Sequence, residues 1–143
     1  MYTARYNGLK QQYESITNER LRIDTLIEMA MEIRNLDLDH AFELAHEIIR
    51  RSEKSGYPLG IGRGNNLLGW CYWQRGDYDD GIEVLSKAYT LAQELRNRPL
   101  EARVLNNFGY IHRDRGDLAN ALSCFEQALV INEELGDELS RSV

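Results

Sequence analysis

The chain has few residues that interrupt or cross-link a backbone, and it has no long apolar run. Only 2 prolines and 2 cysteines occur in 143 residues, which permits long helices and does not suggest a disulfide framework. No stretch approaches the roughly 18 apolar residues that a membrane span requires, and the first residues lack the apolar segment of a signal peptide. With two cysteines far apart in the sequence, the expected location is a reducing cytoplasm.

Positive charge is also scarce relative to negative charge. The 17 lysines and arginines face 23 aspartates and glutamates, for a net charge of −6, which disfavours non-specific binding to nucleic acid. His40 and His46 point to different faces of a helix and have no zinc-protease spacing. The glycine-rich residues 60–64 match no nucleotide fingerprint, and we expect them to form a flexible entry to a helix. No cofactor, metal or catalytic residue is predicted, so an enzyme is the least favoured class.

The sequence repeats itself at an interval of 40 residues. The matching positions are large apolar, small or turn-forming residues: Leu68-Gly69-Trp70 with Phe108-Gly109-Tyr110, Gly76-Asp77 with Gly116-Asp117, and Leu85, Ala88 and Leu95 with Phe125, Ala128 and Leu135. A fixed period of about 20–50 residues is typical of a solenoid. Function is therefore expected on a stacked helical surface rather than in a catalytic pocket.

Each unit predicts two helices separated by a glycine turn. The expected helices lie near 61–75, 78–95, 100–115 and 118–135. Gly76 and Gly116 break the two pairs, and Asp77 and Asp117 are natural N-caps for the second helix of each pair. Gly136 is expected to end the last helix.

The first unit is degenerate. Its first helix fits best at an offset of 39, which places Ala30 in the position of Gly69 and Gly109. These small residues mark where two helices approach closely, so a larger side chain there should cost roughly 1–3 kcal/mol. The expected organisation is residues 1–19 as an N-terminal capping helix, 20–57 as degenerate repeat 1, 58–97 as repeat 2, 98–137 as repeat 3, and 138–143 as the start of a truncated fourth repeat in a longer protein.

An amphipathic helix is predicted before the repeats, near 3–17. Its apolar residues recur at intervals of three and four: Tyr2, Tyr6, Leu9, Tyr13 and Ile16. One interpretation is a cap over the open apolar edge of the first unit, and the other is a dimerising coiled-coil seam. The short length and the tyrosines favour the cap. Residues 129–135, at the uncapped end of the repeats, offer a second surface for self-association.

These residues resemble the tetratricopeptide repeat family over roughly residues 22–137. The likeness is carried by Leu68-Gly69 with Tyr72, Gly76-Asp77-Tyr78, Leu85, Ala88, Phe108-Gly109, Gly116-Asp117, Ala121, Phe125 and Ala128. The usual unit of the family has about 34 residues, so this chain is similar to its long-unit subclass. The resemblance implies an all-α, right-handed superhelical solenoid whose first helices line a concave groove that holds peptides without catalysis. By analogy, the chain is similar to the N-terminal sensory or docking array of larger bacterial signalling proteins.

The first helices of repeats 2 and 3 carry the residues expected to line this groove. They are Arg63, Asn66, Trp70, Trp73, Arg103, Asn106, Asn107, Tyr110 and Arg113. Asparagine can pair with a peptide backbone, arginine can hold a carboxylate through two hydrogen bonds, and the rings offer flat apolar area. The predicted partner is therefore a protein or peptide segment with acidic groups.

Three alternatives stay open at this point. Asn66 and Asn107 can instead cap or bridge neighbouring helices, Trp70 and Trp73 can belong to the core between repeats, and the protein can be a homodimer. The groove interpretation predicts that replacing Asn66 and Asn107 by alanine weakens ligand binding without lowering the melting temperature.

Overall fold

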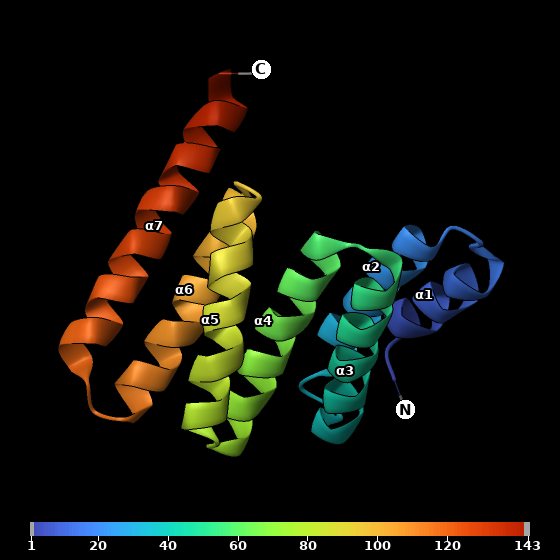
Figure 1. The fold of residues 1–143 in the computed structure, drawn as a ribbon, viewed down its shortest axis with the longest axis horizontal. Coiled ribbons are helices and arrows are strands. Elements are labelled where there is room, and N and C mark those ends of the chain that lie inside the picture. The colour runs from blue at the N-terminus through green and yellow to red at the C-terminus, as the bar shows by residue number, and fades with distance from the viewer. Residues whose placement is uncertain (1, 142–143) are drawn as a thin grey trace.

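The computed structural model describes residues 2–141, with side chains described through residue 138. This part of the chain contains seven α-helices and no strand: α1 (Ala4–Ser15), α2 (Glu19–Ile33), α3 (Leu38–Ser55), α4 (Pro58–Arg75), α5 (Tyr78–Glu94), α6 (Arg98–Asp114) and α7 (Leu118–Arg141). The helix pairs form a row that runs from α1 at one end of the molecule to α7 at the other, and α2 lies behind α3 in the view of Figure 1. The all-α helical solenoid predicted from the repeats is confirmed. Within residues 2–141, no helix is both long and apolar enough to cross a bilayer.

The first helices and the second helices of the units differ in how closely they approach their neighbours. The first helices of the units contact one another, α2 with α4 and α4 with α6. Among the described helices, by contrast, no Cα atom of α3 lies within 8 Å of one in α5, nor one of α5 near α7. A cavity of about 730 Å³ fills the space between α3 and α5, over α4.

Three turns close on a glycine in the left-handed conformation. Gly56, Gly76 and Gly116 have φ angles of 64°, 80° and 83°, a region that costs other residues about 1–2 kcal/mol. After Gly76, the N–H of Asp77 donates to the carbonyl oxygen of Tyr72 at 2.9 Å, which closes the end of α4. The breaks predicted at Gly76 and Gly116 are confirmed.

Aspartates stand at the beginning of the second helices. Asp37 accepts a hydrogen bond of 3.0 Å from a first-turn N–H of α3, and Asp117 accepts one of 3.4 Å from the N–H of Asn120. Asp77 is the N-cap residue of α5, as predicted, but its side chain makes no capping hydrogen bond. Its carboxylate instead lies 3.9 Å from the guanidinium of Arg75.

The small residues of the repeat lie where paired helices approach most closely. A Cβ atom on Gly69 of α4 would overlap the Leu85 side chain of α5, and one on Gly109 of α6 would lie 2.5 Å from Phe125 of α7. Ala30, the corresponding residue of α2, is fully buried. The predicted close-packing positions are confirmed.

The prediction that residues 60–64 form a flexible entry is wrong. These residues lie inside α4, which begins at Pro58. Gly60 and Gly64 face α3, whereas Gly62 faces α5 and α6. A Cβ on Gly60 would overlap Oγ of Ser52, and one on Gly64 would lie 2.7 Å from Cγ1 of Ile49. Gly60 and Gly64 are therefore positions of close packing between two successive units, where no side chain fits.

The prediction that Gly136 ends the last helix is also wrong. Helix α7 continues through this residue to Arg141, and Gly136 is not among the glycines with positive φ. A glycine ends a helix when it takes the left-handed conformation; otherwise a helix tolerates it at a cost of about 1 kcal/mol. Residues 138–141, expected to begin a fourth unit, extend α7 instead, and residues 142–143 lie outside the described residues.

Helix α1 packs on the first helix pair of the same chain. Tyr6 and Leu9 are buried in the core cluster that includes α2 and α3, and Tyr2 and Tyr13 pack against it half-buried. The hydroxyl of Tyr2 donates to Asp37 at 2.7 Å. Ile16, half-buried, follows the end of the helix as its C-cap residue. The residues expected in either a cap or a seam thus cover the edge of the first unit.

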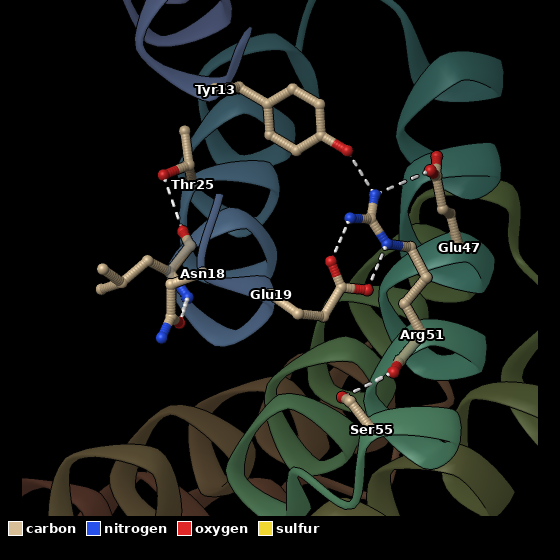
Figure 2. Close-up of polar contacts among 8 residues, drawn as sticks. Tyr13, Asn18, Glu19, Thr25, Glu47, Arg51 and Ser55 are labelled. Atoms are coloured by element: carbon tan, nitrogen blue, oxygen red, sulfur yellow. Dashed lines mark hydrogen bonds and ion pairs between the residues drawn. The ribbon is translucent and has the colours of Figure 1, made fainter. Parts of the chain in front are cut away.

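Arg51 of α3 joins three helices at this end of the molecule. Its guanidinium donates to Glu19 of α2 at 2.6 and 3.0 Å and to Glu47 of its own helix at 3.2 Å. It also donates to the hydroxyl of Tyr13 on α1, and Figure 2 shows all of these groups converging on the one side chain. The hydrogen bonds hold the pKa of the Glu19 carboxyl below its usual value.

Candidate functional site

Two adjoining pockets form a groove along the first helices. The first, here called the amide pocket, has a volume of about 260 Å³. Its polar and aromatic lining is Arg34 of α2, Asn66 and Trp70 of α4, and Arg103, Asn106, Asn107 and Tyr110 of α6. The second, here called the charged pocket, has a volume of about 390 Å³ and lies toward α1. Met31 and Arg103 line both pockets, so the two form one continuous surface.

The structure brings most of the sequence-predicted residues together in this groove. The amide pocket is lined by the predicted residues Asn66, Trp70, Arg103, Asn106, Asn107 and Tyr110. Arg63 lines the charged pocket.

Trp73 and Arg113 line neither pocket and lie beside the groove instead. Trp73 stacks on Tyr110 with ring centroids 4.8 Å apart, and the Arg113 guanidinium lies 5.4 Å from the centroid of the same ring. Asp114 accepts a hydrogen bond of 2.6 Å from the Trp73 indole and one of 3.2 Å from Arg113. These contacts fix the orientation of Tyr110 at the end of the amide pocket.

Two asparagines of the groove bond to each other. The side-chain amide of Asn107 donates to Oδ1 of Asn66 at 2.8 Å, so these residues bridge α4 and α6, as one of the alternatives proposed. Asn107 is 6% exposed. The bond leaves the amide group of Asn66 and the carbonyl oxygen of Asn107 available to a ligand. Asn107 follows Asn66 by 41 residues, one more than the repeat period. The residue that corresponds to Asn66 at an offset of 40 is Asn106.

Trp70 is both a core residue and a wall of the groove. It is 7% exposed and belongs to the cluster that α2 and α3 also form. The guanidinium of Arg34 lies 4.4 Å from the centroid of its ring, and Trp73 meets it edge to face at 6.2 Å. Only one edge of the indole therefore remains for a ligand.

Arg34 is a groove residue that the sequence analysis missed. Burial, with a smaller contribution from Arg103, lowers the pKa of its guanidinium, and its buried Nε has no hydrogen-bond partner. The repeat contains a signal for it: at the offset of 39 that fits the first unit, Arg34 aligns with Trp73 and then Arg113. The irregular first unit hid this relationship.

Apart from Arg103, which lines both pockets, the charged side chains of the charged pocket are paired with one another. Arg5 lies 3.3 Å from Glu32 and 3.8 Å from Glu28, and Arg63 lies 3.8 Å from Asp24. In the amide pocket, neither Arg34 nor Arg103 has a carboxylate within 4.0 Å among the described residues. The two halves of the groove therefore differ in the charge they present to a ligand.

The other chemically active side chains serve packing. His40 shares a hydrogen bond of 2.9 Å with the Tyr2 hydroxyl, and His112 stacks on Phe108. Cys71 is fully buried in the core, where desolvation raises the pKa of its thiol to about 12. Residues 2–138 contain no cluster of three or more His, Cys, Asp or Glu side chains that could hold a metal ion.

A stack of helix pairs with a groove along its first helices defines a helical-repeat protein. A family model described as tetratricopeptide repeat matches residues 60–134, and the chain belongs to this family. Its repeats generally mediate protein–protein interaction and are typically non-catalytic scaffolds.

One relative is the 43 kDa receptor-associated protein of the synapse from Tetronarce californica, which is 35% identical over 72 residues. The alignment covers 50% of this chain and 18% of that protein. The chain thus matches less than a fifth of the length of this relative.

Proposed function

We propose that the groove binds an extended segment of a partner protein and that the segment carries an acidic group. The observation that supports this most strongly is the composition of the amide pocket. It combines the side-chain amides of α4 and α6 with two arginines that have no acidic partner, Arg34 and Arg103. A protein partner is also in keeping with the family and with the printed name of the relative, a receptor-associated protein.

Each group in the pocket has a matching group on an extended peptide. The Asn66 amide donates and the Asn107 carbonyl accepts, so together they can pair with one peptide unit whatever its side chain. Tyr110, held by its neighbours, offers a ring face of the kind that is common at binding hot spots. The arginines then select for negative charge on the segment.

The wider role is also part of this proposal. A groove that captures a protein segment suits the sensory or docking part of a larger regulator, as expected from the sequence. We place the array in the cytoplasm because both cysteines are free thiols.

Self-association is a second candidate, favoured by the outer face of α7. Three large apolar side chains are more than half exposed there: Leu118, Leu122 and Leu129. In the preceding unit, the residues 40 positions earlier, Tyr78, Ile82 and Tyr89, pack against the core that α5 shares with α6. A second copy of the chain would cover the corresponding face of α7.

Selection from a displayed peptide library tests groove binding. We expect selected peptides to lose at least tenfold in affinity when Arg103→Ala and Asn106→Ala are introduced, because both residues line the amide pocket. The control is Arg50→Ala on α3, an exposed arginine outside both pockets, which should leave affinity unchanged. Peptides that bind the double variant as tightly as the wild type would rule the groove out.

Light scattering after gel filtration tests the second candidate. A monomer at every concentration leaves the groove as the working surface. A dimer that Leu122→Glu dissociates, while Asn106→Ala leaves it intact, would make the outer face of α7 the primary interface.

A further inference from the structure

The amide pocket concentrates unmatched positive charge in an acidic protein. The chain has a net charge of −6, and other arginines lie against carboxylates, such as Arg51 with Glu19 and Arg98 with Glu134. Among the described residues, no ion pair or side-chain hydrogen bond involves Arg34 or Arg103, and none of the pocket's lining residues is acidic. Two neighbouring cations without a counter-charge mark a site for an anion.

Arg34 is held in place to receive such a ligand. Its guanidinium lies over the Trp70 ring, 4.4 Å from the ring centroid, and its buried Nε lacks a hydrogen-bond partner in the free protein. A partly desolvated guanidinium without a partner is costly, and an anion that accepts its hydrogen bonds offsets that cost. Because the indole already orients the side chain, little rotamer entropy is lost on binding.

The number of charges and donors favours a dianion over a carboxylate. A carboxylate neutralises one of the two guanidinium charges, whereas a phosphate monoester carries about −1.5 to −2 at pH 7 and has three strong acceptor oxygens. Donors beyond the two arginines are present in the Asn66 amide and the Tyr110 hydroxyl. At about 260 Å³, the pocket is smaller than the roughly 300–1,000 Å³ typical of sites for whole small molecules, so it fits one group of a longer ligand.

We propose that the amide pocket binds the phosphate of a phosphorylated serine or threonine in the captured segment. This assignment rests on the proposed function of the groove. Phosphorylation of the partner would then switch its binding, because the unmodified hydroxyl leaves Arg34 and Arg103 without a counter-charge.

The test compares three short peptides that differ at one position. Each is an acetylated and amidated Ala/Gly pentapeptide with phosphoserine, glutamate or serine at its centre, and inorganic phosphate is a fourth probe. Binding is followed through the NMR signals of the Arg34 Nε–H and the Asn66 side-chain amide. We expect saturable shifts with the phosphoserine peptide, at least tenfold weaker binding of the glutamate peptide, and no shift with the serine peptide.

Two variants and a control establish where the phosphate binds. Arg34→Gln and Arg103→Gln should each weaken the phosphoserine peptide at least tenfold, while Arg50→Gln, which removes the same charge outside the groove, should not. Circular dichroism and thermal melting show whether each variant is folded. If Arg34→Gln does not fold, Arg103→Gln decides, because this side chain is exposed and makes no side-chain hydrogen bond or ion pair with the described residues.

Several results would overturn the assignment. Equal binding of the glutamate peptide would make the pocket a carboxylate site. Inorganic phosphate binding as tightly as the phosphoserine peptide would assign it to the free anion, and an equal loss in Arg50→Gln would show unspecific attraction. If library peptides bind the groove while the phosphoserine peptide does not, the proposed function stands and the phosphate assignment fails.

Discussion

The side-chain amide of Asn107 donates a hydrogen bond of 2.8 Å to the side-chain oxygen of Asn66, across the contact between α4 and α6. The bond joins two successive units within the lining of the amide pocket. Residues that stabilise the stack are thus also residues that a ligand would touch. The expectation that both asparagines can be replaced without a change in melting does not follow from this geometry.

Asn107→Ala should therefore lower stability as well as affinity. Loss of a buried hydrogen bond costs about 0.5–1.5 kcal/mol, which lowers the melting temperature of a chain of this size by a few degrees. Asn66→Ala should cost at least as much, because it leaves the buried side-chain amide of Asn107 without its hydrogen-bond acceptor. A double-mutant cycle measured by urea unfolding should give a coupling of about 1 kcal/mol. Strictly additive effects would show that the bond contributes nothing.

Gly69→Ala should destabilise the protein although alanine is the better helix former. The new Cβ would overlap the Leu85 side chain, so α4 and α5 must separate at a cost of roughly 1–3 kcal/mol. Gly8→Ala is the matched control, because nothing lies within 4 Å of its Cβ position on α1; it should stabilise by about 0.5–1 kcal/mol. Urea unfolding of both variants measures the difference, and changes of the same sign would contradict the close approach.

Arg51→Gln should loosen α1 from the rest of the chain. The variant loses the hydrogen bonds to Glu19 and Tyr13. Since the Glu19 side chain is 42% exposed, we expect a loss of only about 1 kcal/mol. Amide hydrogen exchange should rise in α1 more than in α6. Uniform exchange rates in both helices would indicate that Arg51 does not hold the cap.

The effect of this variant should depend on pH. Hydrogen bonds from Arg51 lower the pKa of Glu19 in the folded state, so the pair stabilises the fold above the unfolded pKa of about 4.3. That contribution is lost as the pH falls through the lowered folded value. The stability difference between wild type and Arg51→Gln should therefore be constant from pH 5 to 7 and shrink at lower pH, as unfolding curves across this range would show.

Cys71 should resist alkylation in the native protein. Burial raises the pKa of its thiol to about 12, so almost no thiolate exists at pH 8, and the reagent has no access. Cys124 is half-buried, and desolvation raises its pKa as well. Mass spectrometry after iodoacetamide treatment should show Cys71 reacting at least tenfold more slowly than Cys124, with the difference removed in urea. Equal native rates would mean that the core around Cys71 opens readily.

The helix pairs and their close approaches could be predicted from the sequence because they repeat. Gly69 and Gly109 are both small because paired helices approach closely at these positions. Since the same requirement recurs 40 residues apart, a single sequence is enough to recognise it. The glycines of residues 60–64 recur nowhere, so their composition suggested a loop. The roles of Gly60 and Gly64 depend on Ser52 and Ile49, which α3 brings against them.

The groove was predictable in part for the same reason. Asn66 and Tyr110 lie on the first-helix face that the period identifies. The hydrogen bond between Asn66 and Asn107 was one of two open alternatives, because side-chain pairing across helices depends on geometry that spacing does not specify. Arg34 was not predicted as a groove residue, because the first unit is one residue shorter than the repeat period. Gly136 shows a further limit, since a glycine permits a left-handed turn without requiring one.

The unequal edges of the helical row give the molecule a preferred direction of bending. The first helices touch, and so form a hinge line, whereas α3 and α5 are separated by a cavity of about 730 Å³. Changing the curvature alters the width of that opening while each tightly packed pair moves as a rigid body. We therefore expect the curvature of the array to change more readily than the packing within each helix pair. A segment held between α2 and α6 would stiffen the array along its whole length.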